Sequence, residues 1–170
     1  MKRSDRDAAY VEFVESRQTR LRRAAYAICG DWHRAEDLLQ TALTKLYVAW
    51  PRLAREGGED AYVRRILMST HLDNLKRASY RREVVGADAD LVHHAQTGRV
   101  DDRDALITAL QQLPAMQRKV VVLRHVLDLS VEQTAADLGI SSGTVKSHHS
   151  RGVARLQELL TDQTVKEDRR

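Results

Sequence analysis

The sequence predicts an all-α protein of two small helical domains joined by a flexible linker. Its 170 residues contain only 2 Pro and 8 Gly. Apolar residues recur at helical spacing, whereas the alternation typical of strands is hard to find. Residues 83–102 break the helical pattern with scattered acids and glycines. We therefore expect domains over residues 1–82 and 103–162, a linker over 83–102, and a charged tail over 163–170.

Composition limits the classes of function. The chain is 42% hydrophobic and 31% charged, which is enough to build cores and unlike a disordered chain. Its net charge of +4 and pI near 9.4 are compatible with nucleic-acid binding. Cys29 is the single cysteine, so no intrachain disulfide can form; we expect a core residue in a cytoplasmic protein. The charged N-terminus lacks a signal peptide, and no apolar run is long enough for a membrane span.

The first helices are expected over residues 8–14 and 21–29. Each segment carries apolar residues at helical spacing. Gly30 should end the second helix, and Asp31 should cap the helix that follows.

Residues 33–50 form the strongest predicted helix of the first half, with a wide apolar stripe. Pro51 is expected to end this helix, because the residue before a proline avoids the helical region. Taken alone, the opposite face predicts a solvated surface. It carries Asp37, Gln40, Thr41 and Thr44.

A basic helix is predicted over residues 61–78, after a loop over 52–60 whose last residue, Asp60, can act as the cap. Tyr62 and Tyr80 interleave with its bases, and such surfaces suit phosphates and unstacked bases. A basic helix can also lie on a membrane surface or be simply soluble. Over residues 61–82 the bases, against the single acid Asp73, are Arg64, Arg65, Lys76, Arg77, Arg81 and Arg82.

The second domain is expected to begin with a helix over residues 103–112. Pro114 suits the first position of the next helix, which buries some of the apolar residues between 120 and 127. The charged last residues are expected to fray.

Residues 129–156 are typical of a helix-turn-helix. Ser130 and Gln133 form a capping box at the start of its first helix. Gly139 can take the left-handed conformation that turns the chain. Either Ser141 or Ser142 then caps the second helix.

The second helix of this motif has two different faces. Its predicted inner face carries Val145, His149, Gly152 and Leu156, and His149 is interpreted first as a packing residue. Its outer face is small, hydroxylated and basic, and residues 141–157 contain no acid. These features favour reading of the DNA major groove over a solvated helix of an ordinary bundle. The outer residues are Gly143, Lys146, Ser147, Ser150, Arg151 and Ala154.

The sequence contains no pattern that predicts catalysis. A glycine-rich phosphate loop, a nucleophile elbow and the HExxH and CxxC motifs are all missing from it. Adjacent histidines such as His148 and His149 point to different faces of a helix and make a poor metal site. We therefore expect neither an enzyme nor a bound cofactor or metal.

Three blocks together resemble the ECF-type (group IV) RNA polymerase sigma factors, and among them a short actinobacterial subgroup. The blocks are AEDLLQTALTKLYVAWPRL (35–53), AYVRRILMSTHLDNLKR (61–77) and LPAMQRKVVVLRHVLDLSVEQTAADLGISSGTVKSHHSRGVARL (113–156). They occur in the family's order and spacing over nearly the full chain. The resemblance implies a subunit that binds core RNA polymerase and directs promoter-specific initiation without catalysis of its own.

For the first domain, the resemblance implies a σ2 fold with two surfaces. The polymerase-binding residues would be Asp37, Gln40, Thr41 and Thr44, on the clamp coiled coil of the β′ subunit. The single strand of the −10 element, with one flipped base, would meet Asp60, Tyr62, Arg64, Arg65, Ser69, Lys76 and Arg77. The family has Asn where this chain has Ser69, so the resemblance does not assign the flipped-base contact.

For the second domain, the resemblance implies a σ4 fold that reads the −35 duplex and meets the β flap of the polymerase. An anti-sigma factor would be a further partner. The residues that would contact the major groove are Ser142, Lys146, Ser147, Ser150 and Arg151.

Two other functions remain open from the sequence. A stand-alone helix-turn-helix regulator would bind duplex DNA as a dimer and sense a ligand with its first domain, which has no need of a basic, Tyr-bearing helix. A protein that mimics sigma folds, such as an anti-sigma factor, would carry an acidic face in place of Arg64, Arg65, Lys76 and Arg77.

Overall fold

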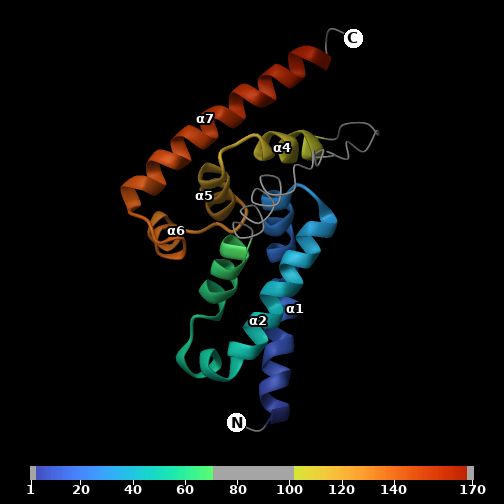
Figure 1. Ribbon diagram of the computed structural model, residues 1–170, viewed down its shortest axis with the longest axis vertical. Coiled ribbons are helices and arrows are strands. Elements are labelled where there is room, and N and C mark those ends of the chain that lie inside the picture. The colour runs from blue at the N-terminus through green and yellow to red at the C-terminus, as the bar shows by residue number, and fades with distance from the viewer. Residues whose placement is uncertain (1–2, 71–101, 168–170) are drawn as a thin grey trace, which may run out of the picture.

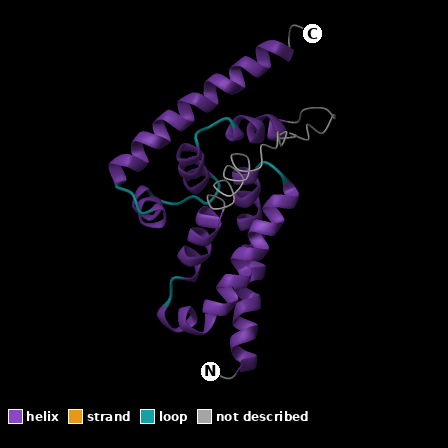
Figure 2. Ribbon diagram, viewed as in Figure 1, coloured by secondary structure: helices purple, strands orange, loops and turns teal. Residues whose placement is uncertain are grey.

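The computed structural model describes the backbone of residues 3–70 and 102–167 and the side chains of 4–70 and 103–162. The described chain is entirely helical, without a strand (Figure 2), as the sequence predicts. The N-terminal helices are α1 (Arg3–Cys29), α2 (Trp32–Glu56) and the helix over residues 59–70. The C-terminal helices are α4 (Asp102–Gln111), α5 (Ala115–His125), α6 (Val131–Leu138) and α7 (Ser142–Glu167) (Figure 1).

The prediction of two separate helices before Gly30 is wrong, because α1 is one continuous helix of 27 residues. Residues 15–20 are polar, so they carry no apolar period, yet they contain no Gly or Pro to break the helix. Gly30 does end α1, with φ of 71°. Asp31 caps α2 as expected, and its side chain accepts a hydrogen bond from the Arg34 backbone N–H at 2.8 Å.

The prediction that Pro51 ends the second helix is also wrong. Pro51 lies inside α2, which continues to Glu56. Trp50 and Leu53 flank the proline and are both buried, so packing holds the last turns in place despite the missing N–H. Gly57, with φ of 80°, ends the helix and donates its N–H to the Leu53 carbonyl at 2.7 Å.

The predicted loop over residues 52–60 shrinks to Gly57 and Gly58, and the next helix begins at residue 59. Asp60 therefore lies inside that helix and is not its cap. Its carboxylate pairs with Arg17 of α1 at 2.7 Å, which ties the start of this helix to α1. Residues 71–78 of the predicted basic helix and residues 83–101 of the predicted linker lie outside the described residues. The last residue of the predicted linker, Asp102, already belongs to α4.

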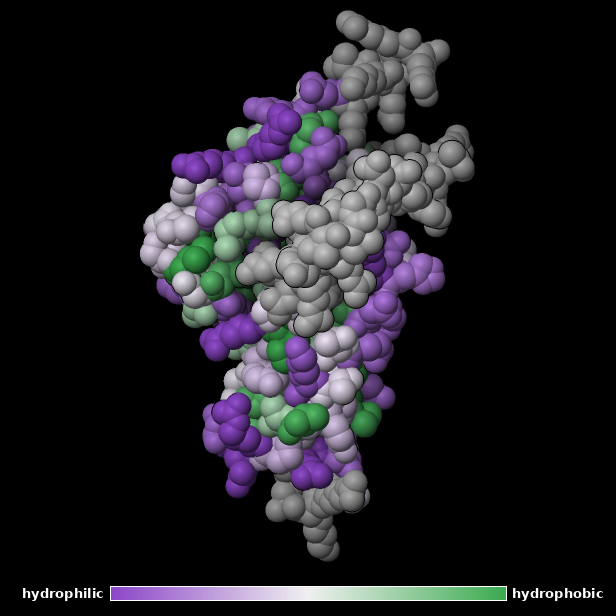
Figure 3. Space-filling model, in the orientation of Figure 1, coloured by the Kyte–Doolittle hydropathy of each residue, from purple (hydrophilic) through white to green (hydrophobic). Residues whose placement is uncertain are grey.

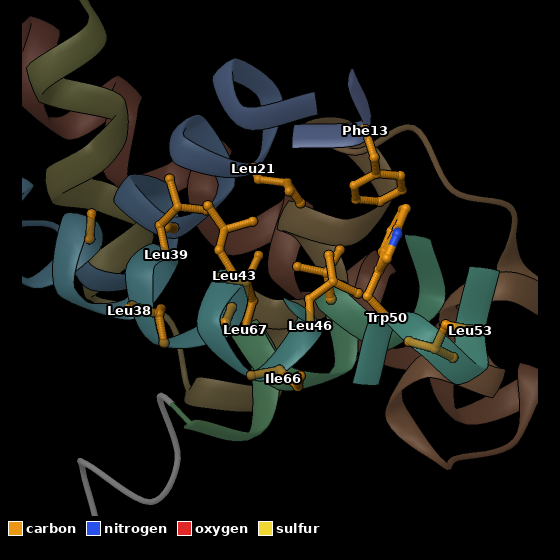
Figure 4. Packing of buried hydrophobic residues seen from close by; sticks show 14 residues of the cluster. Phe13, Leu21, Leu38, Leu39, Leu43, Leu46, Trp50, Leu53, Ile66 and Leu67 are labelled. Carbon is orange, nitrogen blue, oxygen red and sulfur yellow. The ribbon is translucent and has the colours of Figure 1, made fainter. Parts of the chain in front are cut away.

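The first hydrophobic core fills the space between α1, α2 and the helix over 59–70 (Figure 4). Phe13 and Tyr10 of α1 meet Trp50 of α2 edge-on, with ring centroids 5.3 and 5.4 Å apart. The indole Nε1 of Trp50 donates to the Arg6 carbonyl at 3.1 Å, so its polar atom is satisfied in the core. This packing fixes α2 along α1.

Among the C-terminal helices, α5 is the most deeply buried element. It contributes Val120, Val122 and Leu123, each 0% exposed. Pro114 was predicted to be the first helical residue of α5, but it is the N-cap residue that precedes the helix. α7 continues as a helix to Glu167, so the charged tail does not fray before that residue.

A second hydrophobic core joins the N-terminal and C-terminal helices. Ala24, Ala27 and Ile28 of α1, together with Met68, pack in one cluster with residues of α4, α5 and α7. α1 therefore contributes to both cores. Around them, the face in Figure 3 is mainly hydrophilic, with separate hydrophobic patches.

Replacing Gly152 with Ala should destabilise the fold. A Cβ at this position would lie 2.8 Å from Cγ2 of the buried Val121, closer than packed atoms tolerate. We expect the free energy of unfolding to fall by about 1 kcal/mol, since overpacking outweighs the helical preference for Ala. Urea unfolding followed by circular dichroism measures this change.

Gly143→Ala in the same helix is the matched control, because the only atom near its Cβ is Ser141 Oγ at 3.8 Å. This variant should be at least as stable as the wild type. Equal destabilisation of both variants would contradict the close approach of α5 and α7.

Candidate nucleic-acid interface

The helix-turn-helix forms with the local contacts that the sequence predicts. Ser130 Oγ accepts the Gln133 backbone N–H at 3.0 Å, and Gln133 Oε1 accepts the Ser130 N–H at 2.9 Å. Gly139 ends α6 in the left-handed conformation, with φ of 66°. These contacts set the angle at which the chain leaves α6 and enters α7.

Ser141 is the residue that caps α7. Its Oγ accepts the Thr144 backbone N–H at 3.1 Å and lies 2.8 Å from Thr144 Oγ1. Ser142 is the first residue of the helix. Of the two serines that the sequence offers as the cap of this helix, the structure therefore selects Ser141.

The two predicted faces of α7 are confirmed. Val145 is 0% exposed, and Gly152 and Leu156 are also buried. On the outer face, Lys146, Ser150 and Arg151 are exposed, while Ser142 and Ser147 are half-buried. The exposed face therefore presents ammonium, guanidinium and hydroxyl donors and carries no acid before Glu158. Donors of this kind suit phosphates and the acceptor edges of guanine.

His149 joins α7 to the end of α5. Its Nε2 lies 2.8 Å from Nε2 of His125, so one ring donates a hydrogen bond to the other. Burial, and then the neighbouring His125 and Arg124, lower the pKa of His149. The contact agrees with the expected packing role of His149, although the contact itself is exposed to solvent.

The polar face of α2 is exposed along its length. Asp37, Gln40, Thr41 and Thr44 are all exposed. Thr44 Oγ1 donates to the Gln40 carbonyl at 2.8 Å, and Gln40 Nε2 donates to Glu36 Oε1 at 3.0 Å. Both side chains remain exposed to solvent, so a partner can still reach this face. Val48, one turn after Thr44, is 76% exposed and extends the face with an apolar side chain.

The basic helix over residues 59–70 is partly covered by the chain itself. Arg64 Nε donates to Asp137 Oδ2 of α6 at 2.5 Å, and Arg65 Nε lies 3.6 Å from Asp137 Oδ1. The Arg64 side chain is only 14% exposed and that of Asp137 only 2%, whereas Arg65 remains 56% exposed.

The other residues predicted for a single strand do not gather around Arg64. Tyr62 is half-buried against the first core, and Asp60 pairs with Arg17. Ser69 is exposed, and its Oγ donates to the Ile66 carbonyl at 3.2 Å. Lys76 and Arg77 lie outside the described residues.

Comparison with known proteins decides between the functions left open. Residues 13–81 match the Sigma-70 region 2 family, and residues 103–156 match the Sigma-70, region 4 family. The chain is 39% identical over 151 residues to the RNA polymerase sigma-E factor of Streptomyces avermitilis, covering 89% of this chain and 84% of that relative. The chain belongs to the ECF family of RNA polymerase sigma factors.

Further relatives agree with this assignment. The ECF RNA polymerase sigma factor SigM of Mycobacterium tuberculosis is 30% identical over 152 residues, covering 89% of this chain and 77% of SigM. The sigma factor RpoE of Bartonella quintana, solved with the anti-sigma factor NepR, is 29% identical with a TM-score of 0.72, covering 88% of this chain and 97% of RpoE. CnrH, solved with the cytosolic domain of CnrY, shares the fold at a TM-score of 0.67 and 22% identity, over 92% of this chain and 90% of CnrH.

This sigma factor binds core RNA polymerase and directs it to start transcription at particular promoters. Among the described residues, no group of three or more His, Cys, Asp or Glu side chains could hold a metal ion. In the same part of the chain, no helix is long and apolar enough to cross a membrane. Burial raises the pKa of the Cys29 thiol to about 11, as expected for a core residue and unlike a nucleophile.

Sequence reasoning missed the residues that hold the two halves of the sigma factor together. Asp137 is an ordinary polar position on the wheel of α6, and Arg20 is one of many bases in α1. In the structure, Arg20 Nη2 donates to the Leu127 carbonyl at 2.6 Å, across 107 residues of sequence. No local sequence pattern predicts these contacts, because the two residues that each contact joins lie far apart in the chain.

The stability of this sigma factor should depend on His149 below neutral pH. Because its pKa is lowered in the folded chain, the unfolded chain binds the proton more readily. Stability is therefore fully present above the ordinary pKa of about 6.5 and is lost as the pH falls through it towards the lowered value. Urea midpoints at about pH 7.5 and about pH 5.5 measure this loss.

His149→Gln removes this titration and should make the loss of stability on acidification smaller. His33→Gln, at an exposed position of α2, is the control and should lose as much stability as the wild type. If His149→Gln lost as much stability as the wild type, the burial of His149 and its neighbours His125 and Arg124 would not lower the pKa of His149.

Proposed function

We propose that this sigma factor holds its promoter at two places with separate domains. Residues 1–82 would bind the polymerase and the melted −10 element, and residues 103–162 would read the −35 element as duplex. Residues 83–102 would link the domains, and 163–170 would form a charged tail. The chain would act in the cytoplasm, without catalysis of its own, and an anti-sigma factor would be a further partner.

The observation that carries this proposal is the outer face of α7. This face is exposed on the second helix of a capped helix-turn-helix. It presents hydrogen-bond donors and carries no acidic residue before Glu158. The helical wheel and the family resemblance select the same residues independently. These are Lys146, Ser147, Ser150 and Arg151 on the helix that Ser142 begins.

Run-off transcription with purified core polymerase and a genomic promoter library tests the proposed function. Specific transcripts that require the sigma factor are expected, and they also supply the promoter sequence. Promoter binding as a dimer without polymerase would instead support a stand-alone regulator, which the comparisons do not favour.

Arg151→Ala should weaken binding to the selected −35 duplex and leave binding to scrambled duplex nearly unchanged. A guanidinium that donates two hydrogen bonds to a guanine is worth about 1–3 kcal/mol of discrimination. Fluorescence anisotropy of the holoenzyme on both duplexes measures the difference. Arg155→Ala, one turn further along α7 where Arg155 pairs with Glu158 at 2.9 Å, is the control. Equal loss on both duplexes would leave Arg151 a phosphate contact only.

The polar face of α2 should bind the polymerase. Replacing Gln40 and Thr44 together with Ala removes only exposed hydrogen bonds within α2, from Gln40 to Glu36 and from Thr44 to the Gln40 carbonyl, so the fold should be retained. We expect affinity for core polymerase to fall about tenfold or more. Gln157→Ala, an exposed glutamine of α7, is the matched control and should bind as the wild type does. Wild-type affinity of the double variant would exclude this face.

A further inference from the structure

The contact between the basic helix and α6 brings two arginines to one carboxylate. The side chain of Asp137 is 2% exposed, with Arg64 Nε at 2.5 Å from one oxygen and Arg65 Nε at 3.6 Å from the other. A buried carboxylate is costly unless it is paired, so these two guanidinium groups are what permits its burial. The arrangement is an anion site on the N-terminal helices that an acid of the C-terminal helices occupies.

We propose that Asp137 stands in for a phosphate of the promoter strand and keeps the free sigma factor closed. A carboxylate and a phosphate both match the donor fork of arginine. In the closed chain, Asp137 is the ligand of Arg64 and Arg65. In the open chain, a backbone phosphate of the single strand takes its place. This inference rests on the proposed use of the basic helix for the −10 element.

Other contacts of the same interface support a closed state. The last turn of α1 leaves carbonyls without helical partners. Two of them accept donors from the C-terminal helices: Gln111 Nε2 donates to the Ala27 carbonyl and Arg118 Nη1 to the Ile28 carbonyl, each at 3.0 Å. In return, Arg20 donates to carbonyls that follow α5.

The apolar part of the interface explains why the closed state has one defined arrangement. Ala24, Ala27 and Ile28 are at most 3% exposed, and they belong to the same cluster as Leu110 and Leu123. Small side chains on α1 allow its backbone to approach α4 and α5 closely. The Arg64 side chain is only 14% exposed while it holds Asp137, so a phosphate of the strand reaches its guanidinium group only when this contact breaks.

Asp137→Asn tests the exchange, because it removes the charge and keeps the shape. The probe is a labelled single-stranded DNA of mixed sequence, since phosphate contacts carry no sequence information. We expect the free full-length variant to bind it about tenfold more tightly than the wild type. Adding Arg64→Gln to the variant should abolish that gain.

Asp162→Asn is the matched control, since Asp162 is exposed on α7 and no ion pair is observed for it among the described residues. It removes the same charge and should leave strand affinity and shape unchanged. Small-angle X-ray scattering should show a larger radius of gyration for Asp137→Asn only. Equal affinity and equal radius for all three proteins would overturn the proposal.

Two further measurements keep the test decisive. If Asp137→Asn does not fold, as circular dichroism would show, the wild-type chain is titrated with the same strand during scattering. Expansion at saturation supports the exchange, and an unchanged radius overturns it. Run-off transcription, carried out in parallel, separates this proposal from the proposed function. If the wild type initiates transcription but its radius of gyration does not increase with the strand, only the closed state is rejected. If neither the wild type nor Asp137→Asn initiates transcription, the proposed function is rejected.

Discussion

The end of α1 is the point on which the rest of the structure depends. Along most of its length α1 packs on α2 and the helix over 59–70, but its last turns carry a second set of small and apolar residues. Ala27 and Ile28 meet α4 and α5 through their side chains, and their carbonyls accept Gln111 and Arg118. The burial of apolar surface and the satisfaction of helix-end carbonyls thus act at one place.

In the free chain, the three proposed binding surfaces of the sigma factor are not equally accessible. The outer face of α7 and the polar face of α2 are already exposed. The basic helix differs, because Arg64 is held by a buried acid of the opposite half. The −35 and polymerase contacts proposed above therefore need no rearrangement of the described residues, whereas the proposed −10 contact does.

Much of the fold could be predicted from local chemistry. The capping box at Ser130, the left-handed Gly139 and the inner position of Gly152 follow from side-chain types at fixed spacing. The errors came where packing at a distance decides the outcome. Pro51 continues a helix because Trp50 and Leu53 are buried beside it, a fact that no local signal carries.

In the candidate site, too, local features could be predicted from the sequence and long-range contacts could not. The exposed residues of α7 could be placed from its helical period alone. The partner of Arg64 could not, because Asp137 lies 73 residues further along the chain and meets it only when the two halves pack together. The resemblance to sigma factors likewise assigns roles to residues one by one and carries no information about contacts within the free chain.

The distance between the two halves tests the central claim most directly. Spin labels at exposed positions 56 of α2 and 157 of α7, in a chain whose half-buried Cys29 is replaced, report this distance by pulsed electron paramagnetic resonance. The account predicts one narrow distribution for the free sigma factor and a longer distance when it is bound to core polymerase and promoter DNA. The same distribution in both states would contradict it.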